Sequence, residues 1–182
     1  MLFRSSREGV KKATNFAKEV LDEETSKLCS FICCSAERLP FRNGAFTKVI
    51  SISVMEHIPD DKRAFDEIER ITKAGGKVFI YVPNTYKQTP LLFKILGRVN
   101  DRRVGHLRHY QAEEIIQEFE KMGFILDDLM FYVHNIKILQ WILYIALPWL
   151  RDSRWLWKLE ERDLRQKADP HAAAFSIAIT KR

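Results

Sequence analysis

The chain has 182 residues, of which 46% are hydrophobic and 30% are charged. This length and composition suit one domain with a substantial core, and they exclude an intrinsically disordered segment, a collagen-like fibre and a small disulfide scaffold. The formal net charge of +6 is modest and comes without a helix-turn-helix or RNA-binding signature, so we expect no nucleic-acid partner.

The three cysteines, Cys29, Cys33 and Cys34, lie within one short stretch. An odd, clustered set neither pairs completely nor supplies a four-ligand zinc site, which favours a reducing, cytoplasmic location. We expect these thiols to pack as small buried hydrophobic groups. Residues 1–6 contain too short an apolar run to predict a secretory signal.

Hydrophobic periodicity alternates between helical and strand patterns along the chain. It predicts, in chain order, a helix over 7–21, a buried strand over 28–34, a turn over 36–44, a strand over 48–55, a helix over 60–72, a strand over 77–82, a helix over 111–122, and strands over 124–132 and 173–180. Pro59 is expected in the first turn of the second helix. Gly75-Gly76 and Gly123 are expected as helix stops.

Strands that alternate with helices indicate an α/β fold with an open, largely parallel sheet covered on both faces. The last two strands are separated by a long hydrophobic segment, 136–166, and are expected to pair antiparallel at one edge. No internal repeat or low-complexity linker divides the chain. We therefore expect residues 1–182 to form a single domain.

All four tryptophans lie between residues 136 and 157. This stretch is interrupted by polar residues and proline and is too short to span a bilayer as a simple helix. Tryptophan near basic residues is typical of the membrane–water boundary, so a peripheral membrane contact through 136–157 is one interpretation. The other is a hydrophobic lid or a homo-oligomer contact. Both favour a lipophilic ligand.

Ligands of open α/β sheets bind beyond the carboxyl ends of the strands, which here points to residues 34–41, 53–59 and 82–86. The same segments carry a family resemblance. The ordered runs SAERLPF, AFTKVISISVMEHIPD, ERITKAGGKVFIYVPN and GHLRHYQAEEIIQEFEKMGF resemble the central motifs of class I S-adenosylmethionine-dependent methyltransferases, in particular the ubiquinone and menaquinone methyltransferases.

The resemblance implies a Rossmann-like methyltransferase sheet with S-adenosylmethionine as cofactor, and methyl transfer to a small acceptor. The tryptophan-rich stretch favours a lipophilic acceptor, such as a quinone or an isoprenoid lipid. Asn84 follows the fifth strand of the family and is expected to face the substrate. The cofactor-binding positions that the resemblance implies are Ser35, Ala36, Ser51 and Ser53.

Histidine side chains are the candidates for proton transfer and substrate contact. The pair Glu56-His57 matches the family step beside the substrate pocket, with His57 as proton acceptor; helix capping is the alternative. Quinone methyltransferases that use a metal carry an acid at the position of Ser53, so no metal is expected. His106 and His109 lack a third ligand in the sequence nearby and are expected to contact substrate or to stabilise a loop.

The resemblance is incomplete at the amino terminus. None of the seven glycines forms a GxGxG run, and Arg4 stands near the position of the acidic residue that holds the ribose. The first strand and the glycine-rich turn are therefore expected to be absent, which removes backbone N–H groups that bind the cofactor. The chain is interpreted as a truncated methyltransferase with impaired activity. The alternative is a degenerate, non-catalytic binding module.

Overall fold

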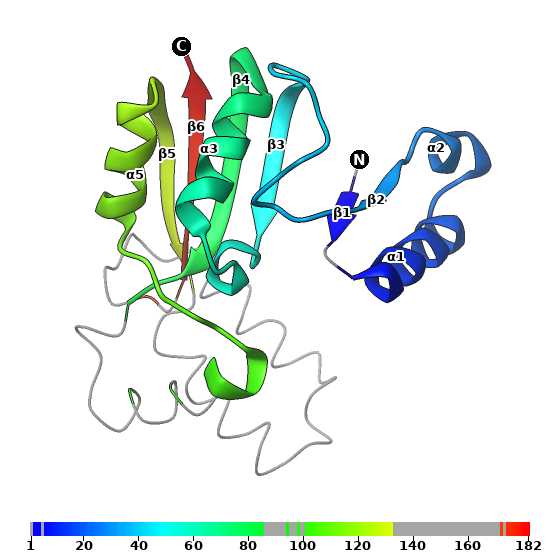
Figure 1. The fold of residues 1–182 in the computed structure, drawn as a ribbon, viewed down its shortest axis with the longest axis horizontal. Coiled ribbons are helices and arrows are strands. Elements are labelled where there is room, and N and C mark those ends of the chain that lie inside the picture. Colours follow the sequence, from blue (N-terminus) through cyan, green and yellow to red (C-terminus); the bar gives the residue numbers. More distant parts are fainter. Residues whose placement is uncertain are drawn as a thin grey trace.

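The computed structural model describes residues 2–4, 6–85, 94, 98, 101–132, 172 and 174–182. Figure 1 shows these residues as a sheet with helices packed on it and a smaller unit at the amino terminus. The helices are α1 (Arg7–Val20), α2 (Glu23–Lys27), the 3-10 turn η1 (Met55–His57), α3 (Asp61–Ile71) and α5 (Ala112–Lys121). The strands are β1 (Leu2–Arg4), β2 (Phe31–Cys33), β3 (Phe46–Ile52), β4 (Thr72–Pro83), β5 (Phe124–Tyr132) and β6 (Ala174–Lys181).

The main sheet has the strand order β3-β4-β6-β5 in this part of the chain. β3 and β4 are parallel, and β6 is antiparallel to both β4 and β5. β3, β4 and β5 therefore run in one direction and β6 runs against them, which confirms the predicted open α/β sheet and its antiparallel final pair. β1 and β2 form a separate parallel pair against which α1 packs.

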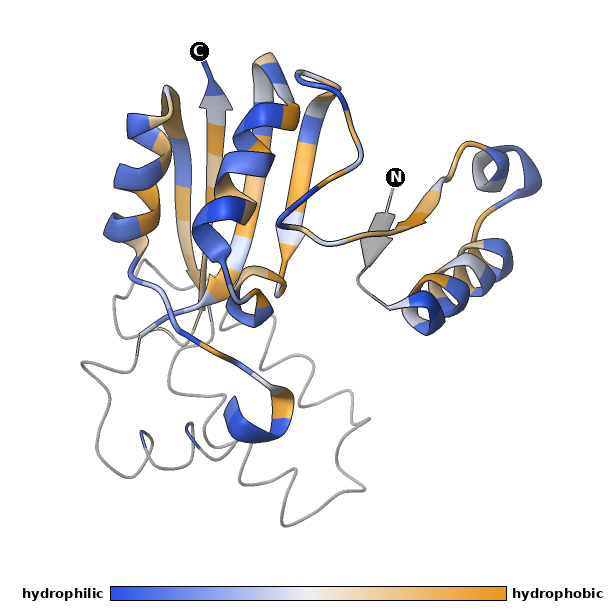
Figure 2. Cartoon of the chain, viewed as in Figure 1, coloured by the Kyte–Doolittle hydropathy of each residue, from blue (hydrophilic) through white to orange (hydrophobic). Residues whose placement is uncertain are grey.

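The core lies between this sheet and helices α3 and α5. Alternate residues of β4 (Val78, Ile80 and Val82) are fully buried, because a strand directs every second side chain to the same face. Phe65 of α3 and Phe119 of α5 meet edge to face with ring centroids 5.3 Å apart, so both helices cover the same face. In Figure 2 these helices present hydrophilic residues outward, and the strands are mainly hydrophobic.

The expectation of helices on both faces is not met within the described residues. Ile50 and Ile52 of β3 point away from the helix-covered face and are 65% and 58% exposed. Val49 and Ser51, the alternate positions of the same strand, are half-buried and buried. β3 is thus a strand whose second face carries exposed aliphatic side chains.

The segment that joins α3 to β4 differs from the prediction. α3 ends at Ile71, where Thr72 donates its side-chain hydroxyl to the carbonyl of Ile68, and β4 begins at once. Gly75 and Gly76 therefore lie within the extended segment and do not stop the helix. Gly75 has a φ of +75°, and a Cβ on Gly76 would lie 2.7 Å from the carbonyl oxygen of Lys73. The glycine pair is needed for this bend in β4.

Two smaller expectations are also corrected. Pro59 precedes the N-cap residue Asp60 and is not in the first turn of α3. The cysteines are not buried: Cys33 is exposed, and Cys29 and Cys34 are half-buried. The physical reason is that β2 pairs only with β1 and lies beside α1, so the apolar run that contains it is not enclosed by a sheet.

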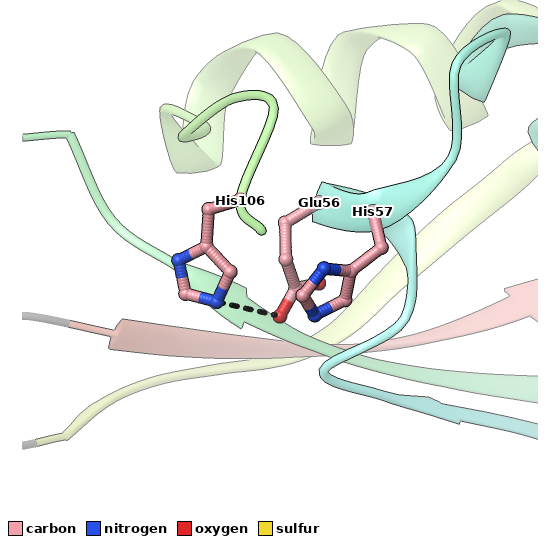
Figure 3. A group of neighbouring side chains, drawn as sticks. All are labelled: Glu56, His57 and His106. Atoms are coloured by element: carbon pink, nitrogen blue, oxygen red, sulfur yellow. Dashed lines mark ion pairs between the residues drawn. The ribbon is translucent and has the colours of Figure 1, made fainter. Parts of the chain in front are cut away.

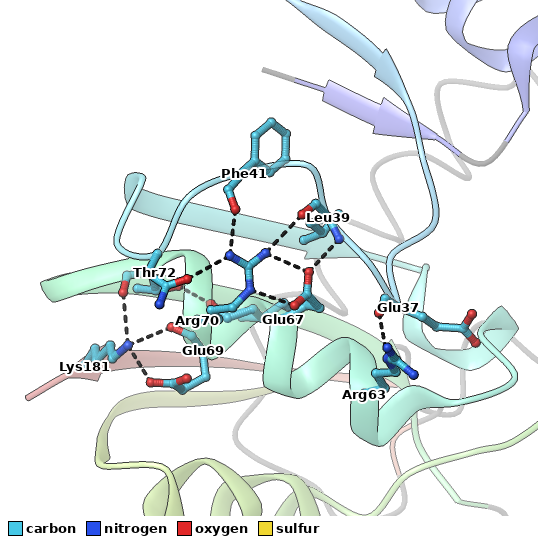
Figure 4. Close-up of polar contacts among 11 residues, drawn as sticks. Glu37, Leu39, Phe41, Arg63, Glu67, Glu69, Arg70, Thr72 and Lys181 are labelled. Carbon is cyan, nitrogen blue, oxygen red and sulfur yellow. Dashed lines mark hydrogen bonds and ion pairs between the residues drawn. The ribbon is translucent and has the colours of Figure 1, made fainter.

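An arginine on α3 holds the loop that leads into β3 (Figure 4). The guanidinium of Arg70 donates to the carbonyls of Phe41 and Leu39, at 2.6 and 3.0 Å, and to the carboxylate of Glu67. Glu67 also accepts the backbone N–H of Leu39. Hydrogen bonds from Arg70 hold the pKa of Glu67 below its ordinary value. The loop is fixed to α3 by charge-assisted hydrogen bonds.

We expect Arg70→Ala to lower the free energy of unfolding by about 2–4 kcal/mol, because it leaves a half-buried carboxylate and two carbonyls without their donor. Urea denaturation monitored by circular dichroism measures the change. The matched control is Lys12→Ala, which breaks an exposed ion pair with Glu8 and should cost less than about 0.5 kcal/mol. Equal effects of the two substitutions would contradict this role of Arg70.

Candidate functional site

The carboxyl ends of β3 and β4 lie side by side because these strands are parallel and Ile52 is in register with Tyr81. Ser53 follows β3 and donates its backbone N–H to the carbonyl of Tyr81 at 3.0 Å. Its φ of +49° lies in the left-handed region, where a residue with a side chain is strained. This conformation turns the chain sharply into η1.

Glu56 of η1 is a buried acid at this turn. Its side chain is 1% exposed, and burial raises the pKa of its carboxyl group above the ordinary value. Oε1 lies 3.9 Å from Nε2 of His106, and Oε2 has no hydrogen-bond partner among the described residues. Figure 3 shows Glu56 together with the rings of His57 and His106, whose centroids are 5.0 Å apart.

Residues 105–110 return across η1 and hold it in place by backbone hydrogen bonds. The N–H of Leu107 donates to the carbonyl of Glu56 at 2.8 Å. The N–H of Tyr110 donates to the carbonyl of Pro83 at the end of β4. A segment that follows β4 in the chain is thereby fixed over the turn that follows β3.

A buried tyrosine anchors the same segment. The hydroxyl of Tyr110 lies 3.0 Å from the carbonyl of Met55 and 2.9 Å from the carboxylate of Asp61, so it donates to one or the other. Burial and the contact with Asp61 raise the pKa of Tyr110, which keeps its proton available for donation. Arg108 forms an ion pair with Asp61 and donates to the carbonyl of Pro59 at 2.7 Å.

The exposed His57 has a defined tautomer. Its Nδ1 lies 2.9 Å from the carbonyl oxygen of Gly105, and because a carbonyl can only accept, Nδ1 carries the proton. In the neutral ring Nε2 then has a lone pair and can accept a proton. The prediction that Glu56 and His57 lie at the carboxyl end of this strand agrees with the geometry, and the catalytic roles remain predictions.

His106 and His109 are brought together by Asp101, a residue that the sequence analysis did not single out. Oδ1 of Asp101 lies 3.0 Å from Nδ1 of His106 and 3.0 Å from Nε2 of His109. Nδ1 of His109 donates to the backbone carbonyl of Asn84 at 2.9 Å. The spacing D-x4-H-x2-H was the one signal of this cluster in the sequence. The turn that brings Asp101 close to the two histidines is marked in the sequence only by a glycine at position 105.

Two of the four predicted cofactor-binding residues line one pocket. Ala36 and Ser51 meet there with Val54, and the buried hydroxyl of Ser51 has no hydrogen-bond partner among the described residues. Ser53 is exposed at the turn. Ser35 is exposed and its hydroxyl accepts the backbone N–H of Glu37.

Asn84, predicted to face substrate, is 4% exposed. Its side-chain amide donates to the carbonyl of Ala172 at 2.8 Å, and its side-chain oxygen accepts the N–H of Thr85 at 2.9 Å. These bonds join the segment after β4 to the segment before β6. Substrate contact by this residue stays a prediction.

The tryptophan-rich segment 136–166, with its predicted lid, oligomer or membrane contact, lies outside the described residues. Within the described part, no helix has the length and apolarity that a bilayer crossing requires.

Residues 6–80 match the family model described as a methyltransferase domain. The chain is 36% identical over 69 residues to a tRNA (carboxymethyluridine(34)-5-O)-methyltransferase of Xenopus tropicalis, a match that covers 36% of this chain and 11% of the relative. It is 26% identical over 97 residues to a probable S-adenosylmethionine-dependent methyltransferase of Mycolicibacterium smegmatis, covering 53% of this chain and 35% of the relative. The matches thus span well under two thirds of these relatives.

The fold is similar to that of a geranyl diphosphate methyltransferase solved in complex with S-adenosylmethionine. The TM-score is 0.67 at 13% identity, and the match covers 99% of this chain and 67% of the other. This likeness supports the Rossmann-like methyltransferase fold that the sequence motifs implied.

We expect Tyr110→Phe to lower the free energy of unfolding by about 1–2 kcal/mol, because it removes the one buried hydroxyl donor that the Met55 carbonyl and the Asp61 carboxylate share. Chemical denaturation measures the loss. Tyr132→Phe, which removes a hydroxyl that lies 3.0 Å from Ser176 at the sheet edge, serves as the comparison. A larger loss for Tyr132→Phe would argue against Tyr110 as the anchor of residues 105–110.

Proposed function

We propose that the chain is a class I S-adenosylmethionine-dependent methyltransferase and that it transfers a methyl group to a small lipophilic acceptor at the carboxyl ends of β3 and β4. The observation that carries the proposal is the buried carboxyl group of Glu56 beside His57 and His106, directly after β3. Open α/β sheets bind their ligands at this edge.

The residues around Ser51 are the proposed contact for one part of the cofactor. The pocket formed by Ala36, Ser51 and Val54 is mainly apolar and contains a buried hydroxyl with unused hydrogen-bonding capacity. We assign Ser51 and Ala36 to cofactor binding, with Ser35 and Ser53 at its margins. S-adenosylmethionine supplies an electrophilic methyl group when bound.

The proposed role of His57 is to accept a proton from the acceptor. The hydrogen bond from its Nδ1 to Gly105 fixes the ring and leaves the lone pair of Nε2 available. Positioned general bases of this kind typically contribute about 10²–10⁴ to the rate. The neighbouring Glu56, in its charged form, stabilises the protonated imidazole by Coulombic attraction.

Apolar side chains near this turn support a lipophilic acceptor such as a quinone or an isoprenoid lipid. Leu107, whose backbone contacts Glu56, is 58% exposed, and Val104 is 45% exposed. A geranyl diphosphate methyltransferase is among the similar structures, and geranyl groups belong to this chemical class. The relative from Xenopus is named for a tRNA, so the expectation of no nucleic-acid partner remains a prediction.

A second candidate function is a non-catalytic binding module. The 182 residues contain no GxGxG run, and a helix amino terminus with such a turn normally contributes much of the cofactor's binding energy. The exposed Ile50 and Ile52 of β3 would suit contact with another protein segment. A measurement of cofactor binding distinguishes this candidate function from that of an active methyltransferase.

We expect isothermal titration with S-adenosylhomocysteine to give a dissociation constant of about 1 μM, corresponding to about −8 kcal/mol. Ser51→Ala should weaken binding about fivefold, because one buried hydrogen bond is lost. Ser30→Ala, at an exposed serine, is the matched control and should bind normally. The absence of heat from a folded sample would favour the binding module.

We expect His57→Gln to reduce methyl transfer by about 100-fold or more, since the glutamine cannot accept the proton. Transfer is measured with radiolabelled S-adenosylmethionine and a hydroxylated quinone as acceptor. Titration of the same variant with S-adenosylhomocysteine controls for folding and cofactor binding, which should be unchanged. A variant as active as the parent chain would exclude His57 as the base.

A further inference from the structure

Asp101, His106 and His109 present three potential metal-ligand atoms to one another. Oδ1 of Asp101 lies 3.0 Å from the facing nitrogen of each histidine, and the ligand atoms of all three residues lie within 4.8 Å of one another. Ligand atoms around a zinc ion with bonds near 2.1 Å are separated by about 3.0–3.4 Å. The two distances from Asp101 therefore match those between ligands of one metal ion.

The hydrogen bonds of the two rings agree with this arrangement. His109 donates from Nδ1 to the carbonyl of Asn84, so in the neutral ring the lone pair of Nε2 faces the carboxylate of Asp101 at 3.0 Å. Two acceptor atoms at that distance repel, and either a proton on Nε2 or a metal ion between them removes the repulsion. A metal-bound histidine commonly donates its second N–H to a carbonyl or carboxylate, as His109 does here.

Each ring nitrogen of His106 also faces a polar group. Its Nδ1 faces Asp101, and its Nε2 faces the Glu56 carboxyl group at 3.9 Å. When Nδ1 is a ligand, the ring proton moves to Nε2, on the side of Glu56. Oε2 of Glu56 has no hydrogen-bond partner among the described residues, and the side chain is 1% exposed. A buried acid is thus available to orient the ligand ring.

We infer that Asp101, His106 and His109 bind a divalent transition-metal ion of the zinc type, with Glu56 and the Asn84 carbonyl orienting the two rings. The three side chains are only 14–18% exposed, which limits competition from water. One carboxylate and two imidazoles form a ligand set that suits zinc or cobalt and leaves a fourth position open. The site lies beside His57 but does not depend on the proposed methyl transfer.

The neighbouring group of Glu56, His57 and His106 is the competing location for such an ion, since its ligand atoms also lie within 4.8 Å of one another. There the Glu56–His106 distance is longer, at 3.9 Å. The shorter distances favour the triad with Asp101. For His106 and His109, the expectation from the sequence that no metal binds rested on the lack of a third ligand, which Asp101 supplies.

Titration with Co²⁺ in the absence of cofactor and acceptor tests the inference, because bound Co²⁺ absorbs visible light according to its ligands. The protein carries Cys29→Ser, Cys33→Ser and Cys34→Ser, so that thiolates cannot bind the ion. We expect one equivalent of Co²⁺ to bind, and Zn²⁺ to displace it. Asp101→Asn and His109→Gln should each weaken binding on the order of 100-fold.

His57→Gln is the matched control and should leave Co²⁺ affinity unchanged. Far-ultraviolet circular dichroism verifies that each variant is folded, and two independent ligand variants guard against the misfolding of one. The inference is overturned by a folded parent protein that binds no Co²⁺, or by Asp101→Asn and His109→Gln binding with the parent affinity. A loss in His57→Gln equal to that in Asp101→Asn would overturn it in favour of the neighbouring group.

Discussion

Parallel pairing between β3 and β4 determines where polar side chains can gather in this molecule. Because the two strands end at the same edge, the turn after β3 and the segment after β4 emerge as neighbours. The backbone bond from Ser53 to Tyr81 then directs the chain into η1, so that Glu56 enters the interior close to the strand ends.

Two polar anchors, one for each of two loops, keep the loops around the junction in place. Arg70 fixes the loop before β3 to α3, and Tyr110 fixes residues 105–110 over η1 through Met55 and Asp61. Both anchors satisfy backbone carbonyls that would otherwise be buried without a donor, which is costly. The loops thereby hold functional side chains on a rigid support, as the proposed chemistry requires.

Hydrophobic periodicity was sufficient to predict α1, α3, α5 and every strand of the main sheet, because each is decided by residues close in sequence. It could not predict that β2 is poorly enclosed, since burial depends on which strands become neighbours. The motif around Glu56 and His57 pointed to the correct edge of the sheet. Asp101 was missed because its approach to His106 and His109 depends on a turn whose geometry is set by tertiary contacts with η1.

The position of β6 has a consequence for how the chain acquires its structure during synthesis. β6 lies between β4 and β5, yet residues 133–173 separate it from β5 in the chain. On the ribosome, the inner edge of β4 and that of β5 therefore remain without partners until residues 174–181 emerge. Pairing between strands so far apart in the chain slows folding. Until it is complete, the unpaired edges of the apolar strands can associate with other chains. The nascent chain is thus most vulnerable to association immediately before β6 is complete.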